Sequence, residues 1–173
     1  MSGIYTIPIS GLKEGQYSYD FEIDKEFFDQ FEESDVKEGM LNVTVEADKR
    51  SSHIDILVRI RGEVRIACDR CLGIFSYPIV CENRLLVKFG KISEDTDPDI
   101  VTVQADEFEL DLKNYFYEYI ILALPIQKIH PADKNGKSAC DQAMMNKLNE
   151  HLAKAETGAD PRWDELKKLI NKN

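Results

Sequence analysis

Residues His53–Leu72, HIDILVRIRGEVRIACDRCL, are the most informative about the fold, because they hold the longest alternating pattern in the chain. From His53 to Ile66 one parity is apolar and the other is polar or charged, with Leu57 as the one apolar residue on the polar side. Period two over this length is typical of a long antiparallel strand with one face on a core and the other in water. Gly62 interrupts the apolar row, which predicts a bulge or a bend there.

A second alternating stretch follows at residues 75–89, and Cys68 and Cys71 lie between the two stretches. Its apolar parity begins at Phe75 and ends at Phe89. Two long alternating segments separated by a short break are typical of a β-hairpin. We therefore predict a hairpin with the cysteine pair at its turn.

The remaining segments predict an α+β fold. Shorter strand patterns occur at 4–9, 17–23, 43–47 and 100–103. Helical spacing runs from Asp106 to Leu124, and Pro125 ends it. We expect a curved antiparallel sheet or partly open β-barrel of about six strands, with this helix packed against it. The sequence leaves open whether the sheet closes.

Two further helices are predicted near the C-terminus. Ser138 followed by Asp141 resembles a capping box, and Asp160-Pro161 is typical of the start of another helix. We therefore expect an α+β domain over residues 1–137 and a helical extension over 138–173.

The chain has a formal net charge of −10, but the charge is unevenly distributed. Residues 41–93 carry nine basic and six acidic side chains, whereas the segments on either side are acidic. An acidic chain disfavours non-specific binding to nucleic acid. A basic contact surface is therefore expected only in the middle of the chain.

No secretory signal pattern opens the sequence, and the longest apolar run, Ile120–Leu124, is too short to span a membrane. We therefore expect a soluble cytoplasmic protein with no membrane partner. Common phosphate-binding, metalloprotease and serine-hydrolase motifs are absent, so we expect no enzyme and no small-molecule substrate. In a reducing cytosol, the four cysteines favour thiols or metal ligands over disulfides.

Cys68 and Cys71 form a C-x-x-C pair that suits half of a zinc site, because a tight turn brings two thiolates to one side. A structural zinc site needs two more ligands, and His130 and Cys140 are the candidates. Their spacing is not that of a standard second half, so two packed thiols at a strand end remain the alternative. A redox role is disfavoured, because the pair lies between two strands rather than at a helix N-terminus.

A basic face is the second candidate site. Six basic side chains lie on the polar parity of the hairpin or in its turn: Arg59, Arg61, Arg65, Arg70, Arg84 and Lys88. Such a surface suits phosphate contacts that position RNA without reading its sequence. The alternative is an ordinary solvated sheet face whose arginines pair with Asp55, Glu63 and Glu82.

The chain resembles the bacterial and plastid YceD family, also called the DUF177 domain. The motifs that carry the resemblance are Gly62-Glu63-Val64, Cys68-Asp69-Arg70-Cys71-Leu72, Asp111-Leu112 with Glu118 and Leu122-Ala123-Leu124-Pro125, His130-Pro131, and the final Asp160-Pro161-Arg162-Trp163. The resemblance implies a non-enzymatic role in the accumulation of large-subunit ribosomal RNA, hence in ribosome biogenesis. Many members carry a second cysteine-rich group near the C-terminus, where this chain has only His130 and Cys140.

These observations predict a non-catalytic factor that binds the precursor of large-subunit (23S-type) rRNA, a ribosomal protein, or both. In the second mode, the acidic body would shield a basic ribosomal protein. The alternative is a metal-stabilised adaptor unrelated to ribosomes, with Trp163, Leu166 and Ile170 of the last helix as anchors for a partner. That helix would otherwise cover the domain's own core. A metal-dependent enzyme is disfavoured, because neither a general base nor an open coordination position is evident.

Overall fold

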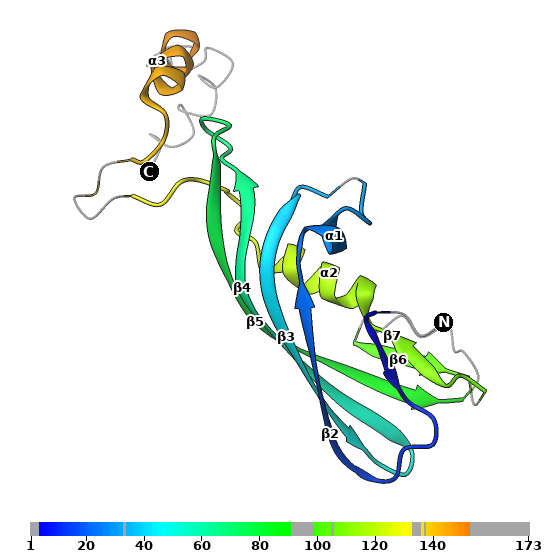
Figure 1. The fold of residues 1–173 in the computed structure, drawn as a ribbon. Coiled ribbons are helices and arrows are strands. Elements are labelled where there is room, and N and C mark those ends of the chain that lie inside the picture. Colours follow the sequence, from blue (N-terminus) through cyan, green and yellow to red (C-terminus); the bar gives the residue numbers. More distant parts are fainter. Residues whose placement is uncertain are drawn as a thin grey trace, which may run out of the picture.

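The computed structural model describes residues 4–32, 34–90, 99–104, 106–132, 136 and 138–152. Figure 1 shows a long, curved sheet with helix α2 along one face and helix α3 beyond one end. The elements are β1 (Thr6–Pro8), β2 (Gly15–Ile23), α1 (Lys25–Phe28), β3 (Glu38–Lys49), β4 (His53–Ala67), β5 (Ile74–Phe89), β6 (Ile100–Val103), β7 (Glu109–Asp111), α2 (Lys113–Leu122) and α3 (Gln142–His151). No helix among these is long and apolar enough to cross a membrane.

Five strands form the main sheet in the order β2-β3-β4-β5-β6. The predicted hairpin is β4 and β5, which pair without a break from His53↔Lys88 to Ala67↔Ile74. The α+β fold with a curved, largely antiparallel sheet is confirmed, although β6 adds a parallel edge beside β5. The sheet is open, because no pairing joins its edge strands β2 and β6 in the described part of the chain.

The segment before α2 differs from the prediction of one helix from Asp106. Glu109–Asp111 is strand β7, paired antiparallel with β1, and α2 begins only at Lys113. The pairing with β1 satisfies backbone groups that an isolated helical turn would leave free. The Asp111 carboxylate then accepts a hydrogen bond from the backbone N–H of Lys113, at 2.8 Å, where the helix starts.

The hydrophobic core lies between the inner face of the sheet and helices α1 and α2. The predicted inner row of β4 is confirmed, since Ile54, Ile56, Val58 and Ile60 are all fully buried. Phe27 and Phe28 of α1 and Phe116 of α2 are buried in the same core. β-Branched residues pack well on a pleated sheet surface, and the aromatic rings fill the volume beneath it.

Gly62 marks the point where the sheet narrows. It pairs with Leu41 and Ile79 in continuous ladders, so, of the predicted bulge or bend, only the bulge is contradicted. Its φ is 153°, and a Cβ there would lie 2.1 Å from the Met40 carbonyl oxygen. Only glycine suits such a position. Because β2 ends at Ile23, opposite Leu41, only β3, β4 and β5 continue beyond Gly62; we call residues 61–80 of the hairpin the arm.

Helix α3 was predicted, but its N-cap is Asp141 rather than Ser138. The Asp141 carboxylate accepts a hydrogen bond from the backbone N–H of Met144 at 3.0 Å. Ser138 instead forms a bridge with Ala132, and its hydroxyl accepts the N–H of Cys140. The predicted last helix, with Trp163, Leu166 and Ile170, lies outside the described residues. The predicted domain boundary after residue 137 also falls there and stays a prediction.

Candidate metal centre and basic sheet face

The turn between β4 and β5 buries both cysteines of the C-x-x-C pair. The N–H of Cys68 donates to the Gly73 carbonyl and the N–H of Leu72 donates to the Cys68 carbonyl, both at 2.9 Å. Cys68 and Cys71 are free thiols, and both are buried. The backbone of the turn therefore fixes two sulfur atoms at the end of the arm, as the sequence predicted.

The loop after α2 returns to this turn. The backbone N–H of Asp69 donates to the Lys128 carbonyl, and the Asp69 carboxylate accepts the Lys128 N–H, both at 2.7 Å. The His130 ring packs against Phe75, with 4.6 Å between ring centroids. The Lys128 ammonium also pairs with Asp35. These contacts hold His130 beside the cysteine pair, 59 residues beyond Cys71 in the chain.

Cys68, Cys71, His130 and Cys140 each offer one ligand atom, and these four atoms lie within 4.8 Å of one another. The Sγ atoms of Cys68 and Cys140 are 3.8 Å apart. His130 Nδ1 lies 3.4 Å from Cys71 Sγ and 3.8 Å from Cys140 Sγ. Zn–S bonds of about 2.3 Å and Zn–N bonds of about 2.0 Å give tetrahedral edges of roughly 3.5–3.8 Å. These three separations therefore match the edges of a tetrahedral zinc site, and the 3.8 Å between the Cys68 and Cys140 sulfur atoms is far too long for a disulfide.

The cluster also favours one thiolate. Burial of Cys68 opposes ionisation of its thiol, but hydrogen bonds from the backbone N–H groups of Cys71, Arg70 and His130 and from the His130 side chain lower its pKa to about 6. The Ser138 hydroxyl favours the Cys140 thiolate, but burial and the neighbouring thiols raise the pKa of Cys140. Cys68 therefore ionises before Cys140, and a bound divalent cation would favour ionisation of the others.

Four protein ligands would fill a tetrahedral coordination sphere, which is typical of structural rather than catalytic zinc. The cluster joins three segments, namely the hairpin turn, the loop after α2 and Cys140, which directly precedes the N-cap of α3. Few apolar contacts join these segments. Among the described residues, only Phe75, Ile129 and Met145 pack against the three cysteines. A metal bound by these four residues would therefore hold distant parts of the chain together.

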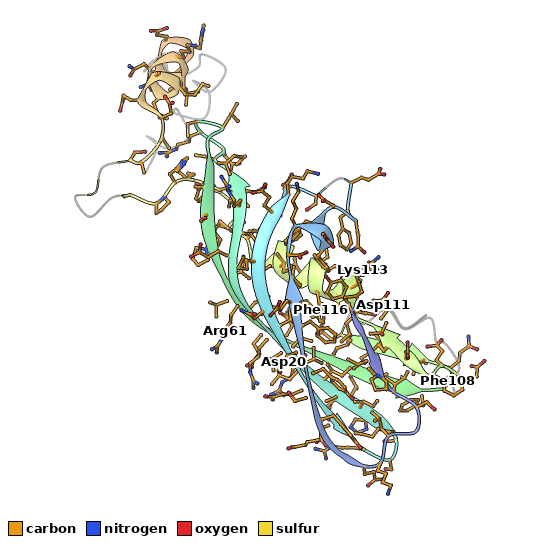
Figure 2. The ribbon with its side chains drawn as sticks, in the orientation of Figure 1. Asp20, Arg61, Phe108, Asp111, Lys113 and Phe116 are labelled. Carbon is orange, nitrogen blue, oxygen red and sulfur yellow. The ribbon has the colours of Figure 1, made fainter. Side chains whose placement is uncertain are left out.

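The predicted basic residues lie on the outer face of the sheet, away from the core. Figure 2 shows Arg61 on the opposite side of the sheet from Phe116 of α2. Arg59 donates to both Glu46 and Glu82, and hydrogen bonds to Glu82 and Glu46 raise its pKa. Arg65 pairs with Glu38 at 3.3 Å. At these two positions the arginines are engaged by neighbouring strands rather than free for a ligand.

The other four predicted basic residues are exposed, and none of their side chains makes an ion pair or a hydrogen bond within the described segments. In register along the hairpin, Lys88 lies opposite His53, Arg84 opposite Leu57 and Arg61 opposite Val80, and Arg70 lies in the turn. The structure therefore distributes the free cations along the hairpin and does not gather them into one patch.

The outer face also holds a groove of about 840 Å³ at the end away from the cluster, lined by residues that include Leu57, Arg84 and Leu86. The sequence pattern did not predict this groove. Its one signal was Leu57, the apolar residue on the polar parity, and a single residue of that kind does not predict a groove.

A search among curated proteins and a search among solved structures each returned no match. The family model described as large ribosomal RNA subunit accumulation protein YceD matches residues 56–170, which is more than half of the chain. The matched span holds the arm and all four residues of the cluster. The chain therefore belongs to the YceD family, as its Cys68–Leu72 turn predicted.

Proposed function

We propose that this protein is a non-catalytic factor that promotes the accumulation of large-subunit (23S-type) rRNA and thereby the assembly of the large ribosomal subunit. The observation that carries the proposal is the match of residues 56–170 to a family named for rRNA accumulation. In this proposal the protein acts in the cytoplasm and has no small-molecule substrate. The cluster supports a non-catalytic role, because its four ligands would leave a tetrahedral metal no open position.

Zinc is the metal that we propose for Cys68, Cys71, His130 and Cys140. Thiolate and imidazole are the ligands that zinc prefers in structural sites, and the separations of 3.4–3.8 Å between Cys68, Cys71, His130 and Cys140 ligand atoms suit a tetrahedral arrangement. Because few apolar contacts join the turn, the loop and α3, the metal would supply much of the free energy that holds them together. Its role is to fix the shape of this end of the molecule.

The proposed partner is the precursor of large-subunit rRNA, a ribosomal protein, or both. Arg61 and Arg70 are the first candidates for contact, since both are exposed and have no ion pair in the described part of the chain. Arg84 and Lys88 would extend the contact along the hairpin. Arg59 and Arg65 could contribute only by exchanging their carboxylate partners, which is feasible because surface ion pairs are weak.

The first test is depletion of the protein in its own organism, followed by a sucrose gradient in which each fraction is probed for large- and small-subunit rRNA. We expect loss of large-subunit rRNA and a surplus of free small subunits. A normal profile would refute the assembly role for this chain.

The contact surface is tested by the double charge reversal Arg61→Glu, Arg70→Glu. We expect it to weaken association with large-subunit precursors, and to flatten the dependence of binding on salt if the contact is to phosphate. Arg50→Glu is the matched control, because Arg50 is a basic residue of the body that pairs with Asp48 and Asp55. Unchanged association of the double variant would show that this face is not the contact surface.

The second candidate function is a metal-stabilised adaptor unrelated to ribosomes. The observation that favours it is helix α3, in which Met144, Leu148 and Leu152 at its end are exposed. An apolar stripe that no described residue covers is typical of a helix that docks a partner. A normal gradient profile after depletion would make this the leading reading, with Trp163, Leu166 and Ile170 as further predicted anchors.

A further inference from the structure

Leu72, which directly follows the cysteine pair, combines an unfavourable backbone conformation with an exposed side chain. Its φ is 60°, and no other non-glycine residue in the described segments has a positive φ. Glycine adopts this conformation freely, whereas a leucine Cβ crowds the following carbonyl. The leucine side chain is 70% exposed, so the core does not require it. Neither the turn nor the core explains a leucine here, which points to a contact made outside the chain.

Leu72 adjoins an apolar strip on the outer face of the arm. Ile74 and Val80 of β5 are 56% and 73% exposed, with exposed Pro78 between them on the same face. Met40 of β3, 79% exposed, lies in the row of Pro78, since both pair with Glu63. Exposed apolar side chains gathered on one surface are typical of a site that contacts another molecule.

Strand addition does not explain this surface. β5 pairs with β6 only from Leu86 onward, so residues 74–85 form an edge in the described sheet. Pro78 lies in the middle of that edge and has no backbone N–H, which blunts pairing with a further strand. The contact is therefore made by side chains on the outer face.

The chemistry of the strip suits a protein rather than RNA. RNA bases are commonly held by stacking on aromatic side chains, whereas this strip is aliphatic. The aromatic residues of the arm, Phe75 and Tyr77, pack against the core on the inner side instead. Aliphatic side chains are better accommodated by an apolar depression on a protein surface.

The charges beside the strip define the partner further. Arg61 lies opposite Val80 in the register, and Arg70 is two residues before Leu72. Both are exposed and make no ion pair within the described ranges. Exposed Glu63 lies between Met40 and Pro78 on this face, since it pairs with both. A complementary surface therefore carries carboxylates opposite Arg61 and Arg70, at the border of its apolar depression, and a basic group opposite Glu63.

We propose that Leu72 and the apolar strip of Ile74, Pro78, Val80 and Met40 dock into an apolar depression, bordered by carboxylates, on a protein component of the large-subunit precursor particle. This inference rests on the proposed function and names the partner class of the arm. Leu72 is the central anchor, because its exposed side chain is kept at a position where glycine would fit the backbone better.

The test measures binding of the purified full-length protein to two probes. One is the large-subunit precursor particle isolated from cells depleted of the protein, and the other is the protein-free rRNA extracted from the same particles. Leu72→Gly removes the side chain and relieves the backbone, and Leu72→Asn does the same with a residue that tolerates a positive φ. Leu72→Met keeps an apolar side chain. Phe108→Ala is the matched control, because Phe108 is 72% exposed and lies at the other end of the molecule (Figure 2).

We expect Leu72→Gly and Leu72→Asn to weaken particle binding by about tenfold or more, as loss of a buried leucine contact predicts. Their thermal unfolding midpoints should be no lower than that of the unmodified protein. Leu72→Met and Phe108→Ala should bind particles as the unmodified protein does. Binding to protein-free rRNA should be unaffected in every variant.

Particle binding that is unchanged in both Leu72→Gly and Leu72→Asn overturns the proposal. An equal loss on protein-free rRNA also overturns it, because the contact would then be with RNA. A dimer of the free protein that Leu72→Gly abolishes would show that the strip joins two copies of this chain. If the unmodified protein binds neither probe, the proposed function itself fails, and this inference fails with it.

Discussion

The body and the tip of this protein are held together by different means. The body consists of the main sheet outside the arm, together with β1, β7, α1 and α2. Its core contains fully buried aromatic residues such as Phe27 and Phe116. The tip consists of the Cys68–Gly73 turn, the loop 126–132 and α3. Its buried cluster is three cysteines, and α3 has no buried residue.

The difference follows from how much apolar surface each region buries. The body buries enough apolar surface to offset the loss of conformational entropy on folding. The short turn, the loop and the solvated helix of the tip do not. Small elements of that kind need another source of stability, such as a metal site. We therefore expect a metal bound by the four ligands to stabilise the tip and to have little effect on the stability of the body.

The largest effect is expected from Phe116→Ala, which removes a fully buried ring from the body. We expect a loss of about 3–5 kcal/mol in the free energy of unfolding, typical for an aromatic residue in a core. Denaturant unfolding followed by circular dichroism measures it. Phe108→Ala serves as the control, because that ring is exposed. A loss below about 1 kcal/mol would mean that the body does not depend on this core.

The next largest loss in the free energy of unfolding is expected from Gly62→Ala, which tests the junction of body and arm. A Cβ at Gly62 would lie 2.1 Å from the Met40 carbonyl oxygen, so β3 and β4 must separate. We expect a loss of roughly 1–3 kcal/mol, as for strain at a glycine-specific conformation. Gly90→Ala is the matched control, since nothing lies within 4 Å of a Cβ there. Equal stability of the two variants would contradict the close approach of the strands.

Cys140→Ser separates the two regions. It removes one of the four cluster ligands, so we expect zinc content to fall from near one equivalent and amide exchange in α3 to rise. Unfolding of the body should change by less than about 1 kcal/mol, because its apolar core is untouched. Cys81→Ser is the control, since Cys81 lies outside the cluster and should leave zinc content unchanged. Absence of zinc from the unmodified protein, purified without chelator, would remove the metal from the account.

The smallest effect is expected from pH in the metal-free protein. The folded tip lowers the pKa of Cys68 to about 6, below the ordinary thiol value of about 8.5. The thiolate therefore stabilises the tip above pH 8.5 or so, and this contribution is lost as the pH falls toward 6. Amide NMR shifts of α3 should show progressive loss of order over that window, while those of the body stay constant. A tip that gains order on acidification would reverse the sign and refute this assignment.

The hairpin, its two faces and the position of the cysteine turn could be predicted from the amino-acid sequence alone. These features depend on neighbouring residues, because period two places alternate side chains on opposite sides of any strand. The buried row from Ile54 to Ile60 and the two thiols at the turn were therefore predictable. The family was also predictable, because its motifs lie in continuous stretches.

Which distant residues come into contact depends on the tertiary fold. His130 and Cys140 join the cysteine pair because hydrogen bonds between Asp69 and Lys128 bring the loop back to the turn. The Arg59 side chain is held in ion pairs, because strand register places Glu82 opposite it and Glu46 close by. Glu109–Asp111 forms a strand, because β1 lies beside it. The register of the strands and the return of the loop after α2 to the hairpin turn both depend on the packing of the whole fold. No local pattern in the sequence predicts that packing.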